Sequence, residues 1–389
     1  MNNWKKTTLG EVCEYESQKT SDLDINTYIS TENMLPNKGG VVLASNLPNK
    51  GTFTKYSNGQ TLVSNIRPYF KKIWRADKNG ACSNDVLCFK LKDKIIDSFF
   101  YYFLNQDTFF EFVMNGAKGT KMPRGDRKHI LQFEINLPPL DEQKRIADVL
   151  SALDDKIEIN NKINENLEAQ AQAIFKQWFV DFEFPDSEGK PYKTNGGKFI
   201  DSELGEIPEG WKVGTLGDVI ENFDSKRKPL SSNIRSKMDK RFPYYGAASL
   251  MDYVDDYIFD GIYLLIGEDG TVVNNMGFPI LQYVWGKFWV NNHAHVIQGK
   301  SKFSVEYIYM LLKNTNVMCA VTGAVQPKIN QSNLNSLKII ISNSLVLKEY
   351  NAIINPFFNN YRNNIEKNQS LSEIRDSLLP KLMSGEIRV

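Results

Sequence analysis

The feature that most constrains this chain is a heptad repeat between residues 138 and 184. Apolar residues recur at alternating steps of four and three, the spacing of a coiled-coil seam. The seam consists of Ile146, Leu150, Leu153, Ile157, Asn160, Asn164, Leu167, Ala171, Ile174 and Trp178. Some 40 helical residues at about 1.5 Å each make a rod of about 60 Å, too long for one small domain to cover. The sequence therefore predicts that this helix packs against a second long helix.

The ends and the middle of this helix are also marked in the sequence. Pro138 and Pro139 stand before it, and Asp141 and Glu142 place negative charge in its first turn, where the helix dipole is positive. Two central seam positions are asparagines, which weaken an apolar seam but penalise slipped registers. We therefore expect one partner helix in one register.

Composition limits the class of protein. The 389 residues, with 41% hydrophobic and 24% charged, suggest two or three globular domains. Lys plus Arg number 47 against 46 for Asp plus Glu, so any basic surface must be local. The four cysteines show no C-x-x-C spacing, and neither a signal peptide nor a membrane-length apolar run is present. We expect a cytoplasmic protein.

The chain carries an internal duplication. The sequence WKKTTLGEV begins at Trp4, and WKVGTLGDV begins 207 residues later at Trp211. The same offset carries NGA at 115–117 onto TGA at 322–324, Lys121 onto Lys328 and Leu140 onto Leu347. Each half is therefore predicted to be a globular module followed by a long helix.

This duplication predicts five segments. They are a first module at 1–137, a central helix at 138–184, a linker rich in Gly, Pro and charge at 185–210, a second module at 211–342 and a C-terminal helix at 343–389. Pro356 and Pro380 are expected to kink or end the last helix, and Gly385 to stop it. Its seam comprises Ile354, Phe358, Tyr361, Ile365, Leu371, Ile374, Leu378 and Leu382.

Both modules read as mixtures of strands and helices. In the first, strands are expected in 59–74 and 85–91 and one amphipathic helix over 95–114; in the second, strands around 262–266 and 294–297 and a helix over 304–317. The predicted fold class is mixed α/β, with two similar α/β modules separated by two long antiparallel coiled-coil helices in a pseudo-two-fold arrangement.

Basic and amide side chains cluster at matching places in the two modules. Two like modules at a fixed spacing suit duplex DNA, which repeats with every helical turn. Such a cluster on its own is more often a solvated surface, but its occurrence at matching positions in both copies favours DNA binding. The candidate DNA contacts are Arg67, Lys71, Lys72, Lys118, Lys121 and Arg124 in the first module and Lys226, Arg227, Lys228, Arg235, Arg241, Gln326, Lys328 and Asn330 in the second.

Catalytic and metal motifs are weak or missing. His293 and His295 form H-x-H, but no third ligand stands at metal spacing. Asp186, Glu188 and Lys190 resemble a nuclease motif, yet they fall within six residues of linker and cannot come from adjacent strands. Neither a phosphate-binding G-x-x-x-x-G-K-[ST] loop nor a G-x-S-x-G elbow occurs. The sequence predicts no catalysis and no metal.

Long stretches resemble one known family. LPPLDEQKRIADVLSALDDKIEINNKINENLEAQ, GKPYKTNGGKFIDSELGEIPEGWKVGTLGDV and SLLPKLMSGEIRV are similar to the specificity (S) subunits of type I restriction-modification systems. The resemblance implies two target recognition domains, each reading half of a bipartite DNA site, and helices that act as spacer and docking surface. It implies the cytoplasm of a bacterial or archaeal cell, DNA methylation and phage defence.

The resemblance also implies partners. Two modification (methyltransferase) subunits and the restriction (ATPase and nuclease) subunits would bring S-adenosylmethionine, ATP and Mg, while this chain would bind no cofactor. Because the modules vary across the family, the role of a basic residue transfers only as a class. Two alternatives stay open: a two-module protein-binding scaffold without DNA specificity, and a chain that is itself a methyltransferase or nuclease.

Overall fold

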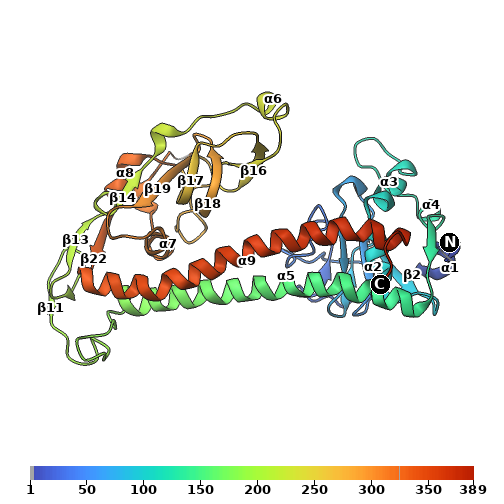
Figure 1. Ribbon diagram of the computed structural model, residues 1–389, viewed down its shortest axis with the longest axis horizontal. Coiled ribbons are helices and arrows are strands. Elements are labelled where there is room, and N and C mark those ends of the chain that lie inside the picture. Colours follow the sequence, from blue (N-terminus) through green and yellow to red (C-terminus); the bar gives the residue numbers. More distant parts are fainter. Residues whose placement is uncertain (1–3, 324) are drawn as a thin grey trace. The chain divides into compact units, whose positions relative to one another are not determined.

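Two long helices dominate the computed structural model, which describes residues 4–323 and 325–389. Helix α5 (Leu140–Phe175) continues into a π-helical turn (Lys176–Val180), and α9 (Ser344–Ser384) ends at Gly385, whose φ of 72° stops it (Figure 1). Helix α9 continues past both Pro356 and Pro380, so the expectation that they could end it is wrong. Both prolines are exposed, so the carbonyl that each leaves without a partner can face water while packing holds the helix together.

The chain divides into two compact units, and both long helices contribute to each. Unit 1 comprises residues 1–160 and 365–389, and unit 2 comprises residues 161–364. In unit 1, Arg375 Nη1 lies 2.6 Å from Asp154 Oδ1, and Asn160 Nδ2 donates to Asn368 Oδ1 at 2.8 Å. Numbers rise along α5 as they fall along α9, so the expected antiparallel pairing is confirmed here.

Unit 2 shows the same direction of pairing. Asn364 Nδ2 donates to Asn164 Oδ1 at 2.9 Å, and in the π-helical turn that follows α5 the Trp178 ring lies 5.9 Å from that of Tyr350. The asparagines at the middle of the seam therefore bond across the helix pair in both units, the arrangement that penalises a slipped register.

Most of the seam residues face the packed side of their helices. Ile374 is the exception, because it is 48% exposed and the next residue, Arg375, turns inward to Asp154. Phe175, Phe179, Tyr350 and Leu379 are buried in addition. The buried seam residues are Ile146, Leu150, Asn160, Asn164, Ala171, Trp178, Ile354, Phe358 and Leu382, and the partly buried ones are Leu153, Ile157, Leu167, Ile174, Tyr361, Ile365, Leu371 and Leu378.

The module of unit 1 contains two four-stranded sheets and a separate strand pair. The pair is β1 (Lys5–Thr8) with β10 (Glu134–Leu137). One sheet has the order β2 (Cys13–Tyr15), β9 (Val86–Leu91), β6 (Thr61–Ser64), β7 (Ile73–Arg75), and the other the order β3 (Lys19–Thr20), β5 (Phe53–Tyr56), β8 (Gly80–Cys82), β4 (Tyr28–Ile29).

The single helix expected over 95–114 is two helices. They are α2 (Asp97–Leu104) and α3 (Asp107–Asn115), with shorter α1 (Leu9–Val12) and α4 (Arg127–Ile130) elsewhere in the module. Gln106 is extended with ψ 146°, and Asp107 begins α3 with a charge that suits a helix N-terminus. Aromatic residues of both helices pack with Leu150 of α5 and Leu382 of α9 in one core, and Tyr102 donates to Asp154 at 2.7 Å.

The module of unit 2 is built on a six-stranded sheet. Its order is β14 (Ile220–Asn222), β19 (Ala294–Gly299), β17 (Phe259–Gly267), β18 (Leu281–Val290), β15 (Phe242–Tyr245), β16 (Leu250–Val254). Strand β13 (Lys212–Thr215) pairs with β22 (Lys338–Ile341), and β20 (Val321–Thr322) with β21 (Lys328–Ile329). The helices are α6 (Ser232–Arg235), α7 (Val305–Lys313) and α8 (Gln331–Asn335), of which α7 is shorter than the expected 304–317.

Helix α7 ties this module to the long helices. Lys313 bonds to Glu168 of α5, and Glu306 lies 3.0 Å from the guanidinium of Arg362 of α9. The segment at 185–210, expected to be a linker, is partly folded: β11 (Phe199–Ile200) pairs with β12 (Ile207–Pro208), and Ile207 is only 1% exposed. No helix within 4–323 and 325–389 is long and apolar enough to cross a membrane.

The backbone shows how the duplicated halves correspond. Leu9 N donates to Phe133 O in unit 1, and Leu216 N donates to Leu337 O in unit 2. The offset is therefore 207 at the start of each module and 204 at its end, because the second module is three residues shorter in between. Lys328 corresponds to Arg124, not to Lys121 as expected, and Leu140 corresponds to Ser344 in place of Leu347.

Candidate nucleic-acid interface

Each unit carries a small hairpin followed by a short capped helix. In unit 1, Lys118 and Arg124 exchange two backbone hydrogen bonds of 2.9 Å, and Asp126 caps α4 by accepting from Lys128 N and His129 N. The equivalent in unit 2 is the β20–β21 hairpin, with Thr322 opposite Lys328, followed by Asn330, which caps α8. The same local device thus recurs at an offset of 204.

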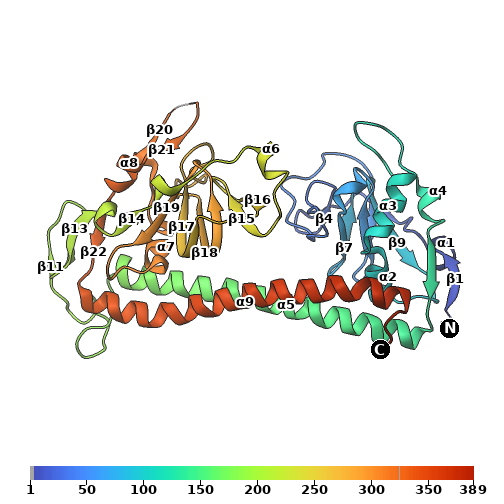
Figure 2. The same ribbon diagram turned by 45° about the horizontal axis from the view of Figure 1, so that its top comes forward.

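The hairpins project from their modules. In unit 2, β20 and β21 lie on the side of the module away from α5 and α9 (Figure 2), and in unit 1 the loop between α3 and α4 does the same (Figure 1). Backbone bonds hold the unit 1 hairpin to a second turn, because Arg67 N donates to Pro123 O at 2.8 Å and Ile66 bridges Arg124. Projecting, positively charged loops on a rigid sheet are suited to contact with DNA.

The basic residues of unit 1 differ in how they are paired. Lys118 lies 2.7 Å from Asp126, Arg124 lies 3.3 Å from Asp85, and Lys71 lies 3.0 Å from Asp107. Lys118 and Arg124 are more than half exposed, so a DNA phosphate can compete for them at small cost. Lys121 is exposed, Lys72 donates to Thr31 O, and no hydrogen bond of the Arg67 side chain is present among the described residues.

Two of the candidate arginines in unit 2 point into the protein. Arg227 is 13% exposed and binds Glu268 at 2.7 Å and Ala294 O at 2.6 Å. Arg235 is also 13% exposed, bonds to Asp252 at 3.0 Å and lies over the Tyr244 ring. The structure therefore assigns both to internal ion pairs in place of the expected DNA contacts. Sequence cannot separate them from exposed neighbours because a basic run looks the same in either case.

The other unit 2 candidates are more accessible. Lys226 and Lys228 are exposed, Arg241 is 64% exposed with only a 3.7 Å contact to Asp239, and Gln326 is exposed near the hairpin tip. Lys328 lies 3.2 Å from Asp269 and 3.4 Å from Glu268, which raises its pKa. Asn330 uses its side chain to cap α8 by accepting from Asn333 N at 2.8 Å. Its side-chain oxygen is therefore engaged in holding the local fold.

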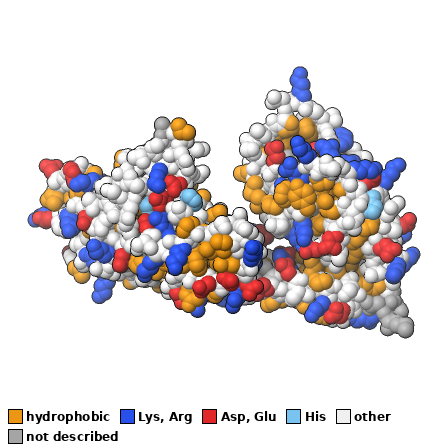
Figure 3. Space-filling model, turned by 90° about the horizontal axis from the view of Figure 1, so that it is seen from above, with side chains coloured by type: hydrophobic (Ala, Val, Ile, Leu, Met, Phe, Trp, Pro, Cys, Tyr) orange, Lys and Arg blue, Asp and Glu red, His pale blue; other side chains and the backbone are white. Residues whose placement is uncertain are grey.

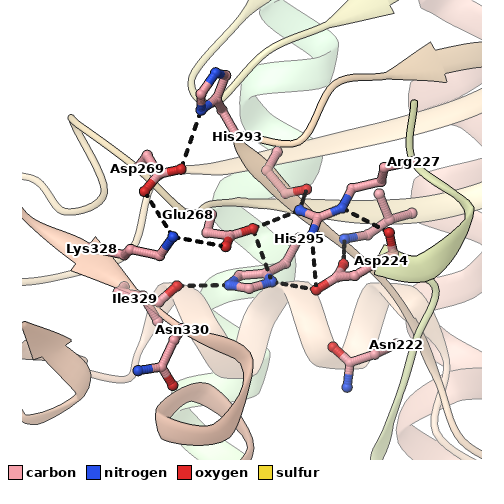
Figure 4. Close-up of polar contacts among 12 residues, drawn as sticks. Asn222, Asp224, Arg227, Glu268, Asp269, His293, His295, Lys328, Ile329 and Asn330 are labelled. Carbon is pink, nitrogen blue, oxygen red and sulfur yellow. Dashed lines mark hydrogen bonds and ion pairs between the residues drawn. The ribbon is translucent and has the colours of Figure 1, made fainter. Parts of the chain in front are cut away.

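A buried charged cluster lies beneath the β20–β21 hairpin (Figure 4). His295 of β19 is 1% exposed; its Nδ1 lies 2.6 Å from Asp224, and its Nε2 lies 2.8 Å from the carbonyl of Ile329 in β21. A carbonyl oxygen only accepts, so Nε2 carries a proton. Burial acts to lower the pKa of His295, but the hydrogen bond and charge of Asp224 outweigh it, and the pKa lies above its ordinary value.

This cluster has the composition of a metal site but not its chemistry. Asp224, Glu268 and His295 each offer a ligand atom within 4.8 Å of the others. Arg227 already bonds to Glu268 and lies 3.6 Å from Asp224, so its guanidinium already pairs with the two carboxylates that a metal ion would need. We therefore assign the cluster to internal charge pairing that anchors the hairpin. His293 of the H-x-H motif pairs instead with Asp269 at 3.2 Å.

Comparison with known proteins places this arrangement in a family. The family model described as "Type I restriction modification DNA specificity domain" matches residues 1–169 and 208–375. The chain belongs to this family. The two matched ranges begin and end near the two halves of the duplication, so each half carries one such domain.

Individual relatives agree with this assignment. The chain is 29% identical over 314 residues to the type I restriction enzyme MjaIX specificity subunit of Methanocaldococcus jannaschii, covering 77% of this chain and 71% of that one. It is 24% identical to the HindI specificity subunit of Haemophilus influenzae over the whole of both chains. A crystal structure of the S subunit from M. genitalium is similar in fold, with a TM-score of 0.52, 20% identity and coverage of 98% and 96%. The predicted family and fold class are confirmed.

Proposed function

We propose that this chain is the DNA-recognition subunit of a type I restriction-modification complex, in which each module reads one half of a bipartite site. The observation that carries the proposal is the recurrence, in both units, of a projecting hairpin fastened to a short capped helix at an offset of 204. The same local backbone structure in both units indicates that the two modules have the same function. Family membership indicates that the task is DNA specificity.

The chain acts without catalysis of its own in this proposal. It docks two modification subunits, which bind S-adenosylmethionine and methylate adenine, and the restriction subunits with ATP and Mg complete the assembly. The long helices α5 and α9 support this role, because their outer faces keep Ile159, Ile163 and Ile374 at 41% to 50% exposure. Exposed apolar side chains on a helix pair are suited to contact with another protein.

Methylation mapping tests the division of labour between the modules. The chain is produced with its modification subunits, and methylated adenines are mapped across a genome. We expect a bipartite site, and Gln326→Ala in unit 2 should relax or change one half of it while the other half is unchanged. Lys6→Ala, an exposed cation on β1, is the control and should leave the site intact.

Four results would contradict the proposal. A site without two separate halves would reject the assignment of one module to each half. Methylation that persists in the absence of this chain would reject its role as specificity subunit. Transfer of methyl groups by the purified chain alone would identify it as the enzyme, and stable binding to proteins with no affinity for any duplex would favour a scaffold.

A further inference from the structure

A strained turn in unit 1 lies against the hairpin. Arg67 and Lys71 have φ of 50° and 51°, and they flank a single 3-10 turn (Pro68–Phe70). Asn37 and Lys38 opposite them have φ of 54° and 62°, and Asn37 N donates to Phe70 O at 2.7 Å. Residues with a Cβ rarely adopt positive φ. A group of them persists only where the surrounding structure holds the backbone in place, and such groups are common at functional sites.

The turn is fastened on three sides. Lys38 and Lys71 bind the two carboxylate oxygens of Asp107 in α3 at 2.9 Å and 3.0 Å. Lys38 N donates to Lys71 O at 2.9 Å, and Arg67 N donates to the hairpin at Pro123 O. These bonds make the turn a rigid support, so the side chains on it are presented in fixed positions.

Arg67 and Lys72, at the two ends of this turn, form no ion pair with a carboxylate within the described chain. The Arg67 Nε is buried without a hydrogen-bond partner, and Lys72 Nζ donates only to the carbonyl of Thr31 at 2.6 Å. No carboxylate within 4–323 and 325–389 forms an ion pair with either. Burial and then the charge of Arg67 lower the pKa of Lys72, and the opposing charge of Glu32 does not offset them, so the two cations repel each other in the free protein. An anion placed between them would relieve both the repulsion and the missing hydrogen bond.

The surroundings of these cations favour nucleic acid as the source of that anion. Tyr69 and Phe70 are 46% and 37% exposed with ring centroids 4.7 Å apart, and Lys72 Nζ lies 5.7 Å from the Phe70 centroid. Exposed aromatic rings beside cations are typical of surfaces that contact sugars and bases next to a phosphate. In the right-hand part of Figure 3, hydrophobic and basic side chains lie next to one another on the face from which the hairpin projects.

We propose that Arg67 and Lys72 form a phosphodiester-binding subsite of unit 1, with Tyr69 and Phe70 at its rim. This inference rests on the proposed DNA-recognition function and adds the residues that hold the backbone of one strand. The planar guanidinium of Arg67 donates to two phosphate oxygens, and Lys72 supplies a point charge. The backbone bonds of the turn hold the Cα of Arg67 in place before DNA arrives.

Replacement of Arg67 separates binding from folding. Arg67→Gly removes the guanidinium and also the Cβ that makes a φ of 50° unfavourable. The full chain is titrated into a labelled duplex of random sequence at several salt concentrations, and thermal unfolding is followed in parallel. We expect Arg67→Gly to melt at the same temperature or higher and to bind about tenfold more weakly, with a salt slope smaller by about one.

Two further variants complete the design. Lys72→Gln should show the same loss of affinity without a change of backbone, and Arg75→Ala, an exposed cation on β7, is the matched control and should bind like the wild type. Unchanged affinity and slope in both Arg67→Gly and Lys72→Gln would overturn the subsite while leaving the proposed function intact. Loss of both thermal stability and binding in Arg67→Gly would assign Arg67 to folding and also overturn it. A wild-type chain that binds no duplex would instead reject the proposed function.

Discussion

The buried asparagines of the helix pair offer a quantitative test of the seam. Asn160 is 1% exposed and donates to Asn368 Oδ1 at 2.8 Å, and Asn368 in turn donates to Ile157 O at 3.4 Å. Asn160→Leu keeps the branched shape of the side chain but removes the hydrogen bond that Asn160 donates to the buried oxygen of Asn368. We expect a loss of about 1 to 3 kcal/mol of unfolding free energy, the cost of a buried polar group that loses its partner.

The double variant is expected to recover most of that loss. When Asn160 and Asn368 are both leucine, the two side chains can pack against each other like the apolar residues of the seam, and neither leaves a buried polar group unpaired. The free energy of unfolding should therefore return to within about 1 kcal/mol of the wild type or exceed it. Chemical denaturation of the wild type, the two single variants and the double variant forms a double-mutant cycle. Asn363→Leu, at an exposed position of α9, is the control for introducing leucine alone.

Two outcomes would refute this reasoning. Single variants as stable as the wild type would mean that the Asn160 to Asn368 bond carries no net stability. A double variant destabilised by the sum of the two single effects would mean that the residues act independently and that the bond does not set the pairing. Either result would remove the physical basis for a single register of α5 and α9.

Three other predictions concern the ion pair, the prolines and the duplication. The pKa of His295 is raised above its ordinary value of about 6.5, so its pairing with Asp224 stabilises unit 2 fully below about pH 6.5, and this stability is lost as pH rises through the raised value; the pKa of Asp224 is lowered, so its contribution is lost as pH falls below about 3.9. The melting temperature should therefore fall on the alkaline side for the wild type and fall less for His295→Gln. Identical curves of melting temperature against pH would contradict the pairing. Pro356→Ala should stabilise α9 by about 1 to 3 kcal/mol in urea unfolding, because it restores a hydrogen bond in an exposed stretch, and a destabilised variant would contradict this. A fragment of residues 1–190 should sediment as a dimer in which Asn160 of one copy contacts Asn164 of the other. Asn364 and Asn368 are the repeats of Asn160 and Asn164 at the offset of 204, and they make the matching contacts in the full chain. A monomer at high concentration would contradict this.

The site shows how far residue types alone can be read. Runs of Lys and Arg predict candidate DNA contacts in both modules, yet Arg227 and Arg235 form internal ion pairs. Asp126 and Asn330 cap equivalent helices, and Asp and Asn are residue types that favour a helix N-terminus. Only the backbone pairing, however, shows that the two residues correspond. Tyr69 and Phe70 look like core residues in sequence, because exposure depends on contacts with residues far along the chain.

The heptad spacing and the repeated WKxxTLGxV segment by themselves predicted the two long helices, their partnership and the two-module plan, because helical periodicity and an internal repeat can be read directly from the order of residues. Only the tertiary structure decided that α9 continues through Pro356, that residues 95–114 form two helices and that the offset changes from 207 to 204. Those features depend on packing energy and on hydrogen bonds between distant strands, which outweigh local preference. The charged cluster around His295 belongs with them, since its members come from separate strands and turns that meet only in the folded chain.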